Sequence, residues 1–157
     1  MRRGRIVHSS RSVRPNVTDG LVTGHVIAIA FWAGLVAVEV LFEAAGVSGK
    51  IDVRSAALLH RWTDRYLELP VLAAVAGTGV ALWARMGWDA GVAWKVGAGL
   101  GAIMFNLVCY VLVERRCQIE SPFEAKRFTW RMIYTVAPGF LLAFAALYMG
   151  GSRGGWW

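Results

Sequence analysis

Four blocks of apolar residues, separated by charged or glycine-containing stretches, dominate the chain. They cover about residues 21–45, 67–84, 92–113 and 132–149. None shows the alternation of apolar and polar positions that is typical of a half-buried strand. Each is long enough to cross most of a hydrocarbon layer of roughly 30 Å as an α-helix. The pattern predicts an all-α integral membrane protein, an up–down bundle of four transmembrane helices.

Polar residues next to the blocks extend the predicted helices. Residues 55–69 contain no helix breaker before Pro70, so the second helix is expected to start ahead of its apolar block, and Pro70 could kink it. The predicted spans are about 21–45, 56–84, 91–114 and 130–149 within a membrane domain over 21–149.

Three of the segments outside these predicted spans carry further predictions. Residues 1–20 are polar and arginine-rich and predict a basic mobile arm, and Thr18 or Asp19 is a good N-cap for the first helix. The connection over 115–130 is expected to be the longest loop and to hold a short interfacial helix. Residues 150–157 predict a short tail.

Composition and charge agree with a membrane protein. Of the 157 residues, 57% are hydrophobic, above the average for soluble domains. The net charge of +7 lies largely beside the predicted spans, where basic flanks of membrane helices are expected. No recognition motif for nucleic acid accompanies it. The expected partners are the lipid bilayer and either another membrane protein or further copies of the chain, and no nucleic acid.

The orientation of the chain in the membrane is harder to predict from the sequence. Basic flanking residues number seven on each side of a four-span chain, so the count alone does not decide. The arm before the first helix holds five arginines, and the first helix usually dominates orientation. We therefore expect a bacterial inner membrane protein with both termini in the cytoplasm. We also expect an uncleaved first helix, because no small-residue cleavage site follows it.

Ionisable side chains inside membrane spans are costly, so each is a candidate for function. Many of them recur here every four residues, which places them along one side of a helix. Up–down topology would bring these stripes to one depth, in a pocket on the face opposite the arm. The predicted members are Glu39 and Glu43; His60, Asp64 and Glu68; Asn106, Tyr110 and Glu114; and Arg131.

Within this set, Glu39, Glu43, His60, Asp64 and Glu68 form a candidate metal site. Carboxylates and an imidazole at helical spacing can hold an iron, zinc or copper(II) ion. The alternative is a solvated structural network at the helix ends, in which His60 and Asp64 form a hydrogen-bonded pair. The residues alone leave both interpretations open.

A smaller polar group is expected at the other end of the bundle. His25 lies near the start of the first helix, and neutral imidazole in a span can be an axial ligand of haem. Lys95 opens the third helix and can extend its amine to the lipid headgroups. His25 and His60 should be more than about 20 Å apart in antiparallel helices, so one haem could not use both.

Several short motifs occur along residues 22–116. They are Gly24-His25 with Trp32 and Gly34, Glu68-Leu69-Pro70 with Gly77-Thr78-Gly79, and Trp94-Lys95 with Arg115. These motifs resemble those of the CopD-like and HemJ-like four-helix membrane proteins. The resemblance implies a small bundle that binds haem b or copper, with His25 and Lys95 matching the family's first-helix histidine and third-helix lysine. Glu39 and the stripe of His60 have no counterpart in the haem oxidase branch.

Two functions compete on these observations. The first is a haem- or metal-binding membrane protein in electron transfer or in copper or haem handling, with haem b or a copper or iron ion as cofactor. The second is a non-catalytic accessory subunit that packs into a larger respiratory, photosynthetic or transport complex. A transporter that uses Glu39 and Lys95 ranks third, because four helices make a narrow path. The aligned polar stripes favour the first.

Overall fold

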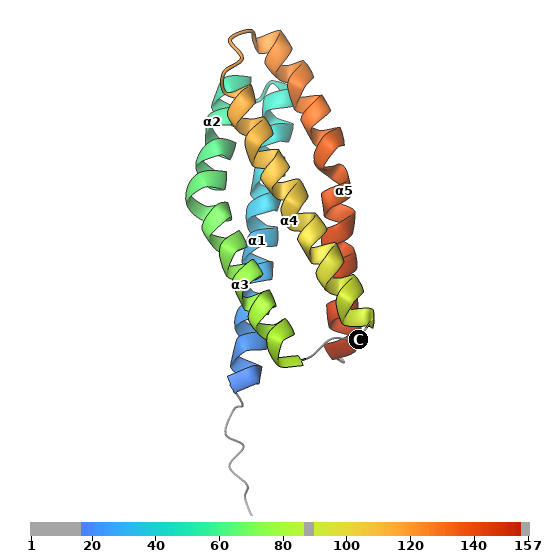
Figure 1. Ribbon diagram of the computed structural model, residues 1–157. Coiled ribbons are helices and arrows are strands. Elements are labelled where there is room, and N and C mark those ends of the chain that lie inside the picture. Colours follow the sequence, from blue (N-terminus) through green and yellow to red (C-terminus); the bar gives the residue numbers. More distant parts are fainter. Residues whose placement is uncertain (1–16, 87–89, 155–157) are drawn as a thin grey trace, which may run out of the picture.

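The computed structural model is a bundle of long helices running side by side (Figure 1). It describes residues 17–86 and 90–154, with side chains over 20–85 and 90–151. The predicted arm as far as residue 16 and the end of the predicted tail, 155–157, lie outside the described residues. The helical elements are α1 (Val17–Ser48), α2 (Val53–Thr63), η1 (Asp64–Glu68), α3 (Leu69–Met86), α4 (Ala90–Arg116) and α5 (Pro122–Gly154).

The described part of the chain contains four helices long and apolar enough to cross a membrane. They are Gly20–Ser48, Val53–Arg85, Ala90–Arg116 and Pro122–Gly151. Large apolar side chains such as Leu41, Phe144 and Leu141 are about two-thirds or more exposed, which suits a surface covered by lipid rather than water. The prediction of an all-α membrane bundle of four helices is confirmed.

The connection between the third and fourth spans differs from the prediction. A long loop over 115–130 was expected, but α4 continues to Arg116 and α5 already begins at Pro122. Ser121 precedes α5 and its hydroxyl accepts a bond from the backbone N–H of Glu124. Serine at the N-cap followed by proline at the first helical position is a strong helix start, because proline has no N–H to leave unsatisfied there.

The second span is continuous but changes its winding. Asp52 caps α2 by accepting bonds from the backbone N–H groups of Arg54 and Ser55. The five residues of η1 then form a π-helical turn, in which the N–H of Leu69 reaches the carbonyl of Asp64. Pro70 follows directly, and its ring and missing N–H disturb the preceding α-helical turn. The disturbance predicted at Pro70 thus takes the form of a π turn.

The spans pack as two helical hairpins, α1 with α2–η1–α3 and α4 with α5. The first turns at Gly49, whose φ of 77° ends α1 in a conformation that favours glycine. In the second, a Cβ atom at Gly139 would lie 2.5 Å from Cβ of Phe105, so only glycine allows this approach of α5 to α4. The two hairpins meet around a core that includes polar side chains.

Candidate metal centre

A group of ionisable side chains is buried between α1 and α2–η1, with a contribution from α4. We call it the acidic cluster. Each of its members has 6% or less of its surface exposed, and carboxyl groups outnumber the cations that could pair with them. The members are Glu39, Glu43, His60, Asp64, Glu68 and Arg116.

The winding of η1 helps to hold this group together. In an α-helix a step of four residues turns about 400°, so a stripe at that spacing drifts about 40° per step. A π turn holds more residues, which offsets the drift. His60, Asp64 and Glu68 are therefore all buried although they are eight residues from end to end.

His60 is the centre of the acidic cluster. Its Nδ1 lies 2.5 Å from Oε1 of Glu43. Its Nε2 lies 3.5 Å from a carboxylate oxygen of Glu39 and 3.6 Å from one of Asp64. Both of the last distances exceed a normal N–H···O bond, and Nε2 is buried with no hydrogen-bond partner.

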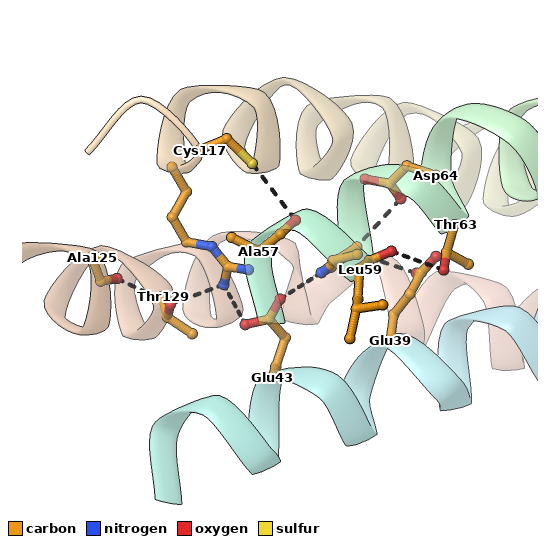
Figure 2. A network of polar contacts seen from close by, with 11 residues as sticks. Glu39, Glu43, Ala57, Leu59, Thr63, Asp64, Cys117, Ala125 and Thr129 are labelled. Carbon is orange, nitrogen blue, oxygen red and sulfur yellow. Dashed lines mark hydrogen bonds and ion pairs between the residues drawn. The ribbon is translucent and has the colours of Figure 1, made fainter. Parts of the chain in front are cut away.

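Figure 2 shows Glu39 and Glu43 extending from α1 towards α2, and Asp64 lies on the helix that faces α1. The ligand-type atoms of Glu39, His60 and Asp64 all lie within 4.8 Å of one another, and all three residues are buried. One oxygen of Glu39 and both oxygens of Asp64 have no hydrogen-bond partner. Buried polar atoms are usually paired, so this concentration of unpaired atoms is unusual.

Arg116 closes one side of the acidic cluster. Its Nη1 donates to a carboxylate oxygen of Glu43 and, at 2.9 Å, to the hydroxyl of Thr129 on α5. The Thr129 hydroxyl in turn donates to the carbonyl of Ala125. Glu43 is thus held between Arg116 and His60, and it fixes the ring of His60 through Nδ1.

Glu68 forms the other side. One of its oxygens accepts bonds from the indole N–H of Trp32 at 2.9 Å and from the amide of Asn106 at 2.6 Å. These two donors come from α1 and α4, so Glu68 ties three spans together. Asn106 is therefore placed beside the acidic cluster, as its stripe predicted.

The other residues expected in this pocket lie outside the acidic cluster. Glu114 accepts a bond from Nε of Arg61 at 2.9 Å on the partly exposed side of the bundle. Arg131 is exposed, and Tyr110 is half-buried. On a regular α-helix the step of four carries Tyr110 and Glu114 progressively away from the face of Asn106.

In the sequence Arg116 resembles an ordinary basic flank, and its place in the core was missed. The signal lay in the spacing of α4. Ala102, Val113 and Arg116 are its buried residues, and they follow the true helical period rather than a strict interval of four. Trp32 and Thr129 were also missed, because both look like ordinary residues of a membrane helix.

His25 and Lys95 lie at the other end of the bundle. Nδ1 of His25 is 2.8 Å from the hydroxyl oxygen of Thr78, and this hydroxyl donates to the carbonyl of Ala74. The hydroxyl therefore accepts from an Nδ1–H, which leaves Nε2 of His25 as an acceptor. A Cβ at Gly150 would lie 3.2 Å from Cε of Lys95, so Lys95 packs against α5.

The separation of the two histidines agrees with the helical geometry. Glu39 follows His25 by fourteen residues on α1, a rise of about 21 Å. Since Glu39 is next to His60, one haem cannot be bound by both histidines.

Comparison with protein-family models, with curated proteins and with solved structures finds no match for this chain. The resemblance to the CopD-like and HemJ-like proteins stays a prediction. The function must therefore be inferred from the chemistry of the side chains.

Proposed function

We propose that this small integral membrane protein binds one divalent transition-metal ion between α1 and α2–η1. Glu39, His60 and Asp64 would be the ligands, and the ion would serve electron transfer or metal handling. The arrangement of Nε2 of His60 carries the proposal. This atom has no hydrogen-bond partner, and two carboxylate oxygens face it at 3.5 and 3.6 Å.

These separations match the geometry of a shared ion. Two ligand atoms that lie about 2.1 Å from a tetrahedral ion are separated from each other by about 3.4 Å. The distances from Nε2 are close to this value and too long for good hydrogen bonds. Three protein ligands would leave a fourth position open, the usual arrangement at reactive rather than purely structural metal sites.

The surroundings of His60 support the same assignment. Metal-binding histidines commonly donate their second ring N–H to a carboxylate, which fixes the ring and strengthens the ligand. Glu43 occupies this position at Nδ1, 2.5 Å away, and Arg116 in turn orients Glu43. Nε2 is then the nitrogen that carries the free lone pair.

Charge gives further support. When fully ionised, the four carboxylates of the acidic cluster leave an excess of three negative charges over Arg116. Buried charge of one sign is costly in a membrane protein unless it is neutralised. A divalent cation would remove most of the excess at the point where the oxygens are unpaired.

The donor atoms indicate which metals fit. The three ligands supply oxygen and imidazole nitrogen, which suit iron(II), zinc and copper(II). The group lacks the thiolate and thioether donors that favour copper(I). Electron transfer would require iron or copper, whereas zinc would point to metal handling. Haem at His25 with Lys95 is a separate prediction, and it draws no support from the acidic cluster.

The proposal is tested by metal analysis and titration of the detergent-purified chain. We expect one ion per chain, and an affinity for iron(II) or zinc that falls about 100-fold in Glu39→Gln and in Asp64→Asn. Glu114→Gln is the matched control, because this carboxylate pairs with Arg61 outside the acidic cluster. A wild-type chain that is isolated metal-free and takes up no ion would refute metal binding. It would favour a structural network in an accessory subunit.

A further inference from the structure

A cavity among the described residues offers a route by which an ion could reach the buried ligands. One cavity of about 240 Å³ lies where the start of α2, the end of α4 and the start of α5 meet. Its lining includes Asp52, Arg54, Ala57, Arg116, Ile119 and Glu120. It is the side chain of Arg116 that connects this cavity to the acidic cluster.

Two side chains link the cavity to the ligand atoms. Arg116 lines the cavity and donates to Glu43, and Glu43 contacts the ring of His60. Nε2 of that ring faces Glu39 and Asp64. Breaking the contact between Arg116 and Glu43 would therefore open a polar path from the cavity to the proposed metal position.

Aromatic side chains indicate that the cavity lies on the water side of the membrane. Trp62 and Tyr66 contact each other with ring centroids 4.8 Å apart and ring planes tilted by 35°, and they are 63% and 57% exposed. Trp130 and Tyr134 on α5 are also exposed. Exposed tryptophan and tyrosine at one level are typical of the boundary between lipid and water.

The position of the other lipid–water boundary agrees with placing this end of the bundle at the membrane surface. Trp83, 42% exposed, follows Trp62 by twenty-one residues. That interval corresponds to about 31 Å of helix, close to the roughly 30 Å of a hydrocarbon core. Asp52 and Ala57 precede Trp62, so this placement puts the cavity beyond the lipid boundary.

Arg116 is held on one edge only. Nη1 bonds Glu43 and Thr129, but Nε and Nη2 are buried without a partner. Unpaired buried donors weaken the closed position. If the guanidinium turned into the cavity, the carboxylates of Asp52 and Glu120 in its lining would be available as partners.

The geometry points to this cavity as the water-side entrance for a hydrated divalent cation, with Arg116 as the positioning residue that closes it. The inference rests on the proposed metal site. Asp52 and Glu120 offer carboxylate oxygens to the ion in a lining that also holds Arg54 and Arg116, and release of Glu43 by Arg116 lets the ion pass to His60.

Cobalt(II) uptake by the metal-free protein, followed by stopped-flow absorption, tests the entrance. In Arg116→Gln the rate of uptake should rise at least tenfold. Arg115→Gln, next to it and exposed, should leave the rate unchanged. Equal rates in wild type and Arg116→Gln would contradict the role of Arg116.

A second variant tests the cavity without disturbing Arg116. In a Cys117→Ser background, Ile119→Cys places a thiol in the lining, and a bulky maleimide there should slow cobalt uptake at least tenfold. Gln118→Cys, which is exposed and outside the lining, is the matched control. Uptake that is equally fast in both labelled proteins would overturn the entrance while leaving the metal site intact. If the wild type binds no cobalt(II), both the entrance and the proposed function fail.

Discussion

The bundle has two polar regions with a histidine, and they differ in what surrounds it. In the acidic cluster His60 is 3% exposed and faces carboxylate oxygens that have no hydrogen-bond partner. At the other end His25 is half-buried and bonded to the hydroxyl of Thr78. The Thr78 hydroxyl pairs with Nδ1 of the half-buried His25. In the acidic cluster, buried atoms on several side chains have no partner, and they lower stability unless a ligand pairs with them.

The same comparison shows how far each region depends on the fold. The acidic cluster draws side chains from α1, α2, η1 and α4 and is held at its edges by Trp32 and Thr129. The hydrogen bond of His25 joins α1 to α3 alone. Changes in the acidic cluster should therefore disturb both metal binding and the bundle, while changes around His25 should act locally.

Arg116→Gln should have the largest effect on stability. It leaves Glu43 without its cationic partner in a buried position, and breaking a buried ion pair costs about 3–5 kcal/mol. The free energy of unfolding of the detergent-solubilised protein measures this. Arg61→Gln is the control, because its pair with Glu114 is partly exposed, and it should change stability far less. Equal losses of stability in the two variants would mean that burial of the Arg116–Glu43 ion pair makes no difference to its contribution.

Glu43→Gln should weaken metal binding about 10- to 100-fold, because Glu43 orients the His60 ring without being a proposed ligand. The amide can still accept a bond from Arg116, but the buried guanidinium loses its anion, so the free energy of unfolding should also fall. Zinc affinity is measured by competition with a chelating dye. An unchanged affinity would mean that the contact between Glu43 and His60 has no part in metal binding.

Trp32→Phe should destabilise the protein by about 1.5 kcal/mol, since it removes an indole hydrogen bond to the carboxylate of Glu68. Asn106 continues to donate to the same oxygen, so metal affinity should change less than tenfold. Thermal unfolding and zinc titration together test this. A complete loss of metal binding would make Glu68 part of the ligand set.

Thr78→Val should have the smallest effect. It removes the hydroxyl bonded to His25 with little change of volume, at a cost of about 1 kcal/mol. Metal affinity of the acidic cluster should be unaffected because the site is about 20 Å away. Thermal unfolding and a zinc titration check both statements, and a fall in zinc affinity would show that the two regions are coupled.

Much of the fold could be predicted from the sequence, because apolar blocks of membrane length leave few alternatives. Two acidic stripes were visible as well, since Glu39 and Glu43 are four residues apart and His60, Asp64 and Glu68 follow one another at the same interval. The connection predicted over 115–130, a loop with a short interfacial helix, is instead part of α5 from Pro122 onward, because Ser121 and Pro122 are a good helix start.

The details of the site were harder to predict, for physical reasons. Through the π turn of η1, an interval of four residues keeps side chains on one face of the helix. On the regular helix α4 the same interval does not, so Glu114 lies on another face and pairs with Arg61. Arg116 looked like one of several flanking arginines, and its burial depends on the packing of α4 against α2 and α5. Arg131 is exposed because it lies on a face of α5 that points away from the core.

The central claim is that His60, and not His25, is a ligand of a bound metal ion. The most direct test is the visible spectrum of the cobalt(II)-loaded protein in wild type, His60→Ala and His25→Ala. Ligation by His60 predicts intense low-coordinate cobalt(II) bands in the wild type, their loss in His60→Ala and their retention in His25→Ala. Bands that persist in His60→Ala, or a wild-type protein that stays colourless with cobalt(II), would contradict it.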